Sequence, residues 1–103
     1  MAGDEEDKRL TGLLTAFDLA YQRALNAIEN DRDLDRAFRR VTVVGEHVQA
    51  LREQLTALRA QTAKRIYDSE SLSLAVLANR VGVSRSRAAQ LVAEGTKQEE
   101  KDA

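Results

Sequence analysis

Residues 72–95 read LSLAVLANRVGVSRSRAAQLVAEG, which is two short amphipathic segments separated by one glycine. Ser73 precedes the first segment and can accept a hydrogen bond from a free amide of its first turn. Gly82 can adopt the positive φ that a sharp turn between two helices requires. Ser84 stands at the N-cap position of the second segment. The stretch therefore predicts two short helices that meet at Gly82.

The inward positions of these two helices are small or apolar. Ala78 and Ala88 leave room for two helices to cross at a steep angle over a short turn. Val83 is expected to fill the angle between the helices. The other inward positions are Leu74, Leu77 and Val81 in the first helix and Leu91 and Val92 in the second.

Polar side chains occupy the outward positions at the start of the second helix. They are Arg85, Ser86, Arg87 and Gln90. Arginine can donate paired hydrogen bonds to guanine or bind phosphate, glutamine can pair with adenine, and serine can bond to bases or phosphates. The N-terminal end of the helix dipole also favours an anion there. Residues 71–92 contain three arginines and no acidic residue, so this region is basic within a nearly neutral chain.

The stretch 72–95 resembles the helix-turn-helix of bacterial transcription regulators and of the promoter-reading domain of sigma factors, and residues 73–88 carry the pattern in the form S-L-A-x-L-A-x-R-V-G-V-S-R-S-R-A. The resemblance implies that the second helix reads the major groove of DNA and that the first helix braces it. It assigns the reading role to the four polar residues named above. Arg80 and Lys97 become candidate phosphate contacts, and the capping Ser84 is included in the predicted DNA-binding set.

Two positions depart from that pattern. Val76 stands where an exposed polar residue is usual, which predicts that Val76 packs on a preceding helix. Glu94 would direct a negative charge toward DNA, so the reading face is expected to end within the first two helical turns. The resemblance covers about 22 residues, and the remainder of the chain matches no family by pattern.

Two longer helical patterns precede this region. Over residues 5–29, apolar side chains recur at alternating steps of four and three and predict an amphipathic helix. This stripe consists of Leu10, Leu14, Phe17, Tyr21, Ala24 and Ile28. Residues 30–33, Asn-Asp-Arg-Asp, break the pattern, because Asn tolerates a left-handed conformation and either Asp can cap a new helix. A tight turn between two helices is expected there.

The second pattern, from Leu34 to about Tyr67, holds a heptad register for about four repeats. Its apolar seam consists of Leu34, Ala37, Val41, Val44, Val48, Leu51, Leu55 and Leu58. A single helical hairpin covers only part of such a seam, so association with a second copy is the simplest cover. We therefore predict a homodimer through Val41, Val44, Val48, Leu51, Leu55 and Leu58. The alternative is that the first helix and the C-terminal segment of the same chain cover the seam.

Composition excludes several classes of protein. A chain of 103 residues suits one domain. It has no cysteine and no proline, and only 4% of its residues are aromatic, which excludes disulfides and favours helices over a sheet. No apolar run approaches the ~18 residues of a membrane helix, so a cytoplasmic protein is expected.

Nothing in the sequence indicates catalysis. His47 is the only histidine, and a lone histidine of this kind is not expected to bind a metal. Ser84 and Ser86 have no base at a motif spacing, and no glycine-rich phosphate loop is present. We expect no enzyme activity, no catalytic residue, no metal and no cofactor.

These inferences predict an all-α protein with three regions: a long antiparallel, coiled-coil-like hairpin over residues 1–70, a helix-turn-helix over 71–97 and a disordered tail over 98–103. The expected function is that of a bacterial transcription regulator, associated with the nucleoid, that binds double-stranded DNA as a homodimer. One alternative is a coiled-coil adaptor that docks on a protein of the transcription or partition machinery. Another is a plasmid, phage or nucleoid protein that coats DNA.

Overall fold

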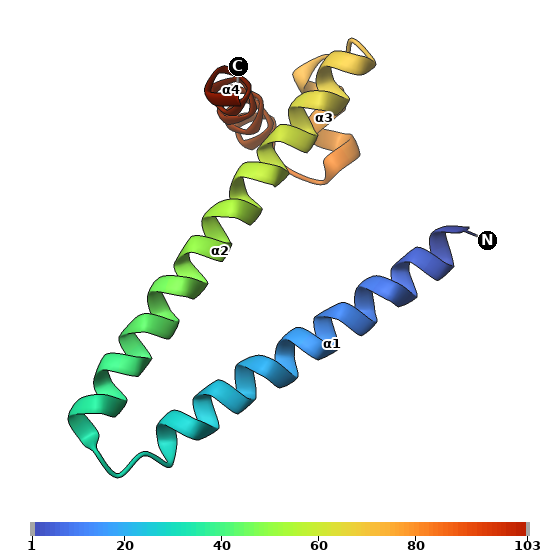
Figure 1. Ribbon diagram of the computed structural model, residues 1–103. Helices are drawn as coiled ribbons and strands as arrows, with labels where there is room; N and C mark the ends of the chain where they lie inside the picture. Colours follow the sequence, from blue (N-terminus) through green and yellow to red (C-terminus); the bar gives the residue numbers. More distant parts are fainter. Residues whose placement is uncertain (1, 103) are drawn as a thin grey trace. The chain divides into compact units, whose positions relative to one another are not determined.

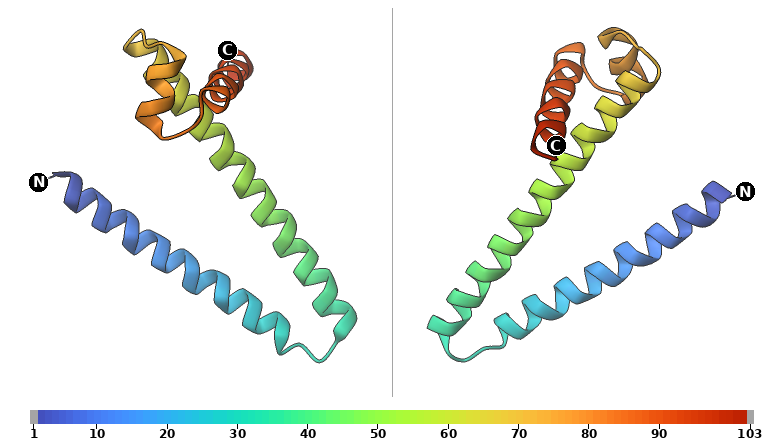
Figure 2. Two further views of the ribbon diagram at one scale, coloured as in Figure 1. Left: turned by 180° about the vertical axis from the view of Figure 1, so that it is seen from behind. Right: turned by 45° about the horizontal axis from the view of Figure 1, so that its top comes forward.

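The structure is a computed structural model that describes residues 2–102. These residues form four helices and no strand, which confirms the all-α expectation (Figures 1 and 2). The helices are α1 (Ala2–Glu29), α2 (Leu34–Ser69), α3 (Leu74–Val81) and α4 (Arg85–Asp102). The chain divides into two units, Met1–His47 and Val48–Ala103. The boundary between the units falls within α2, which therefore contributes residues to both.

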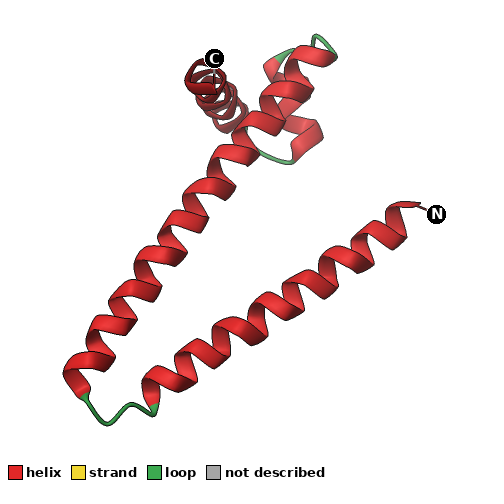
Figure 3. Cartoon of the chain, viewed as in Figure 1, coloured by secondary structure: helices red, strands yellow, loops and turns green. Residues whose placement is uncertain are grey.

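In the first unit, a four-residue turn joins α1 to the beginning of α2 as a helical hairpin, as expected (the green loop at the bottom of Figure 3). Asp33 caps α2, because its Oδ1 accepts a hydrogen bond from the backbone N–H of Arg36 at 3.0 Å. Asp31 Oδ1 accepts a second bond, from the N–H of Asp33 at 3.0 Å. The two aspartates thus have separate roles: Asp33 is the N-cap of α2, and Asp31 stabilises the turn before it.

Asp31 also binds two arginines of α2. Arg36 donates from Nε at 2.8 Å and from Nη2 at 2.7 Å, and Arg40 donates from Nη1 at 3.3 Å. The Asp31 side chain is only 3% exposed. The hydrogen bonds from Arg36 and then from the Asp33 backbone lower the pKa of Asp31 to about 2. A charged carboxylate therefore fastens the turn to the first turns of α2.

The apolar stripe of the first unit is mostly exposed. Phe17 on α1 is 53% exposed, and Leu34, Phe38 and Val41 on α2 are exposed as well, whereas Ile28 is buried. Exposed apolar side chains that follow one face of a helix indicate a surface that packs against another helix or another protein.

The second unit has a small core of its own. The end of α2 contributes Ala60 and Ala63, and the crossing of α3 with α4 contributes Leu77, Ala78 and Ala88. Leu77 is fully buried. Ile66 and Tyr67 of α2 pack against the second group. The end of α2 therefore packs against both α3 and α4.

The predicted disordered tail is a point of difference, because α4 continues to Asp102. Glu99 Oε2 lies 3.7 Å from Lys64 Nζ, and Gln61 Nε2 donates to Asp102 Oδ2 at 3.3 Å. Residues 98–102, which carry only polar and charged side chains, are therefore helical and make polar contacts with α2. Residue 103 of the predicted tail lies outside the described residues.

α4 crosses α2 at very short distance near Gly95, which is buried. A Cβ atom on residue 95 would lie 2.5 Å from Lys64 Cβ and 2.7 Å from the carbonyl oxygen of Ala60. Only glycine fits this crossing, which explains why a poor helix former occurs inside α4.

Over residues 2–102, none of the helices combines the length and the apolar character that a membrane span needs.

Candidate nucleic-acid interface

The interface is built on the turn between α3 and α4. Gly82 has φ 73° and ψ 36°, the left-handed conformation that was expected. The N–H of Val83 donates to the carbonyl of Ala78 at 3.0 Å, which closes the end of α3 in a Schellman-type arrangement. At the other end of α3, Ser73 Oγ accepts a bond from the N–H of Val76 at 3.2 Å. Both predicted caps of α3 are confirmed.

Ser84 caps α4 as predicted. Its Oγ accepts a hydrogen bond from the N–H of Arg87 at 3.0 Å, and its carbonyl accepts one from the N–H of Ala88 at 2.9 Å. Because Ala88 is fully buried against α3, the first turn of α4 is held at both its cap and its inner face. The direction of this helix end is therefore set by the core of the second unit.

The outward residues of that first turn form what we call the α4 tip, defined as Arg85, Ser86, Arg87 and Gln90. Arg85, Ser86 and Gln90 are exposed, and Arg87 is partly buried. Arg87 Nη1 donates to Gln90 Oε1 at 3.2 Å. This bond orders two side chains of the tip and leaves the rest of the guanidinium and the amide N–H₂ free to donate.

Of the other predicted DNA-binding residues, Ser84 directly precedes the tip as the cap of α4, whereas Arg80 and Lys97 lie away from it. Arg80 forms an ion pair with Glu70, and both side chains are about half exposed. Lys97 Nζ lies 3.7 Å from Glu94 Oε1. Lys97 also lies ten positions after Arg87, about 15 Å along the helix. Arg80 and Lys97 therefore flank the tip and do not belong to it.

One expectation about this region is wrong. Val76 was expected to pack on a preceding helix, but its side chain is 51% exposed. It lies on the outer side of α3, whereas Leu77 and Ala78 occupy the inner side, because consecutive helical positions differ by about 100°.

Sequence reasoning missed Lys64 and Gly95, which hold α4 in place. The Lys64 ammonium pairs with Asp68 and lies near Glu99, and the hydrogen bond to Asp68 raises the pKa of Lys64 above its usual value. Gly95 permits the close crossing. A glycine inside an amphipathic helix was the available signal for Gly95, but its partners on α2 are more than 30 positions away in the sequence.

Over residues 2–102, no group of three or more His, Cys, Asp and Glu side chains is placed to hold a metal ion. The first turn of α4 is a basic, hydrogen-bonding helix end that is held by the Ser84 cap and the buried Ala88. Such an end can bind phosphates and the edges of bases.

No protein family, no curated protein and no solved structure matches this chain.

Proposed function

We propose that the protein is a bacterial transcription regulator that binds double-stranded DNA sequence-specifically as a homodimer. The observation that carries the proposal is the left-handed turn at Gly82 followed by a capped α4 whose exposed first turns bear Arg85, Ser86, Arg87 and Gln90. A helix end of this kind fits the major groove, where arginine reads guanine and glutamine reads adenine.

The homodimer is proposed because the seam of α2 exposes large apolar side chains. Leu55 is 68% exposed and Leu58 is 58% exposed. Burial of a leucine side chain stabilises an assembly by about 1.5–3 kcal/mol. Two copies related by a two-fold axis would present two α4 tips, and a separation of ~34 Å would place them in successive major grooves of a palindromic site.

The test is DNA retention by the double substitution Arg85→Ala and Arg87→Ala. We expect the affinity for a selected duplex to fall at least ~10-fold, since each lost base or phosphate contact costs about 1–3 kcal/mol. The wild-type protein should lose affinity with a log–log salt slope of about −4 to −5, and the variant should have a shallower slope.

The matched control replaces two exposed arginines of the first unit, Arg23→Ala and Arg39→Ala, which removes the same charge. Its DNA affinity should stay within about twofold of wild type. Circular dichroism and the mass in solution should be unchanged for both variants. Equal retention by the Arg85→Ala, Arg87→Ala variant and the control would refute the proposed reading face.

A second candidate is favoured by the exposed Val76 and the exposed seam. In this reading the chain is an adaptor that docks on a protein of the transcription or partition machinery, and α3 and α4 serve as a packing module. It predicts no salt-dependent DNA retention by the wild-type protein.

A DNA-coating protein, in contrast, would retain DNA but protect it from nuclease without a defined boundary.

A further inference from the structure

The two arginines of the α4 tip differ in what their own helix offers them. Side chains three and four positions apart are neighbours on a helix. Arg85 is followed at these positions by Ala88 and Ala89, which have no polar side chain, whereas Arg87 is followed by Gln90. Arg87 Nη1 donates to Gln90 Oε1 at 3.2 Å. The Arg87 guanidinium is therefore held by a neutral side chain of α4, and the positions that follow Arg85 offer it no equivalent.

The hydrogen bond also fixes the orientation of the Gln90 amide. A guanidinium has N–H donors and no acceptor, so the amide atom that faces Arg87 must be the oxygen, and Gln90 Nε2 is turned away from it. The backbone beneath both side chains is held as well, because Ser84 Oγ accepts from the N–H of Arg87 and Ala88 is fully buried. Arg87 and Gln90 therefore form an ordered pair in the absence of DNA.

This arrangement bears on which base the pair can read. A paired contact with adenine requires a glutamine oxygen that accepts from the adenine amino group. In the α4 tip the Gln90 oxygen already accepts from a guanidinium, and a hydrogen bond from a charged donor is roughly twice as strong as one from a neutral donor. The groups left to face a base are N–H donors of Arg87 and of Gln90 Nε2. Guanine presents two acceptors, O6 and N7, in the major groove.

No acidic side chain of α4 lies close enough along the helix to compete for Arg87. The first acidic residue of α4 is Glu94, seven positions after Arg87 and about 10 Å along the axis. Glu94 Oε1 itself lies 3.7 Å from Lys97 Nζ. Within residues 2–102, neither Arg85 nor Arg87 forms an ion pair. Gln90 is therefore the side chain of α4 that orients Arg87.

We propose that Gln90 is a positioning residue for Arg87 and that the two side chains together read guanine, so that Gln90 reads no adenine of its own. This inference rests on the proposed function and narrows its half-site. The base pair opposite Arg87 and Gln90 is G·C, with the guanine edge facing the two donors.

Two substitutions of Gln90 test this role on the duplex that the wild-type protein selects from a random pool. Each base pair of the half-site is replaced in turn, and the ratio of the affinities for the selected and the replaced duplex is measured. Gln90→Leu removes the acceptor for Arg87 and should lower the preference for guanine at one position about 10-fold. Gln90→Glu keeps an acceptor for Arg87 and should retain that preference within about threefold. The added negative charge lowers the affinity for every duplex, so the ratio is the readout.

If Gln90 instead reads adenine, the same two variants give a different pattern. Both would lose the preference at an A·T pair, because neither Leu nor Glu offers adenine an acceptor and a donor together, and both would keep every preference for guanine. That pattern would overturn the inference and leave DNA binding by the α4 tip in place.

A double-mutant cycle separates positioning from direct contact. In the Arg87→Ala background, Gln90→Leu should change the base preferences by less than about twofold, since the side chain that Gln90 positions is gone. In the Arg85→Ala background, Gln90→Leu should keep its full effect. An equal effect of Gln90→Leu in both backgrounds would contradict the positioning role.

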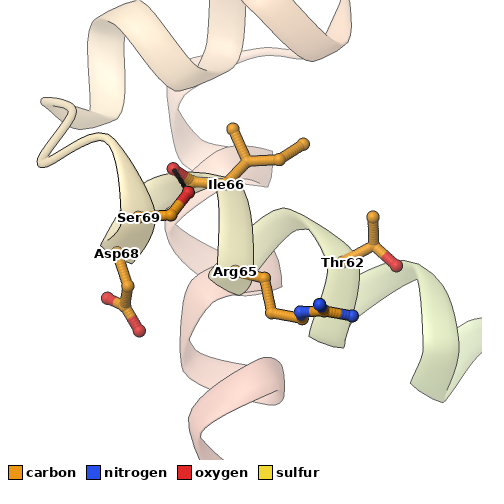
Figure 4. Close-up of a pocket in the computed structure, with 5 residues that line it drawn as sticks. All are labelled: Thr62, Arg65, Ile66, Asp68 and Ser69. Carbon is orange, nitrogen blue, oxygen red and sulfur yellow. Dashed lines mark hydrogen bonds between the residues drawn. The ribbon is translucent and has the colours of Figure 1, made fainter.

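Arg65 supplies a charge-matched control within the second unit. It is exposed and lies in a shallow depression at the end of α2, beside Thr62 and Ser69 (Figure 4). The two hydroxyl groups there are engaged by their own helix, because Thr62 Oγ1 donates to the carbonyl of Leu58 at 2.8 Å and Ser69 Oγ to that of Ile66 at 3.4 Å. Arg65→Ala should leave every base preference unchanged. A loss of the preference for guanine in this variant would show that overall charge sets it, and would overturn the inference.

The outcomes keep this inference apart from the proposed function. A selected duplex whose guanine preferences are all insensitive to Gln90→Leu would overturn the inference and leave the proposed regulator standing. Retention of no duplex by the wild-type protein would refute the proposed function and the inference with it.

Discussion

At the scale of single residues, the surroundings of Gly95 and Asp31 limit which side chain each position accepts. A Cβ atom on residue 95 would overlap with the carbonyl oxygen of Ala60 and the Cβ of Lys64, and neither atom can move without shifting α2. Asp31 is surrounded by two guanidinium groups and one backbone N–H. Each position therefore yields a prediction whose sign follows from its surroundings.

Gly95→Ala should destabilise the protein by about 1–3 kcal/mol, because the added methyl group overlaps with α2 and the crossing must open. The matched control is Gly12→Ala, a helical glycine with open space around its Cβ position. Gly12→Ala should stabilise the protein by about 0.5–1 kcal/mol through helix propensity. Urea unfolding measures both free energies. A stabilising effect of Gly95→Ala would contradict the close crossing.

The Asp31 cluster predicts a pH dependence of stability. Folding lowers the pKa of Asp31 from 3.8 to about 2. As the pH falls, the Asp31 carboxylate therefore becomes protonated in the unfolded chain before it does so in the folded protein. The stabilisation is therefore fully present above about pH 5 and is lost as the pH falls toward 2. The unfolding free energy of wild type should exceed that of Asp31→Asn at pH 7, and this difference should shrink between pH 5 and pH 2. A difference that does not change with pH would rule out a charged Asp31 as the cause.

At the scale of helices, the parts predictable from the sequence were those determined by neighbours along the chain. The caps Ser73 and Ser84 and the left-handed Gly82 follow from local hydrogen bonding and local sterics, and all three were predicted. The break at residues 30–33 was predicted for the same reason.

The parts that could not be predicted depend on long-range contacts. The last turns of α4 contain only polar and charged residues, and their helical state involves Gln61 and Lys64 of α2. The pairing of Arg80 with Glu70 likewise joins positions ten apart across a loop. As a result, the tip of α4 was located by sequence, whereas the ion-pair partner of Arg80 was not.

At the scale of the whole molecule, the proposed regulator needs two elements that work together: a surface that joins two copies and a helix end that reads DNA. The exposed seam and the α4 tip provide a candidate for each. If dimerisation positions the two tips, the recognised sequence must reflect the two-fold symmetry of the protein.

The most direct measurement is a gel-retardation selection of the full-length protein on a pool of random duplexes, with the mass of the protein in solution determined under the same conditions. The account predicts a mass of two chains and enrichment of an inverted repeat whose half-sites lie about 10 base pairs apart, centre to centre. Retention of no duplex, or of duplexes that share no sequence after repeated rounds, would contradict it.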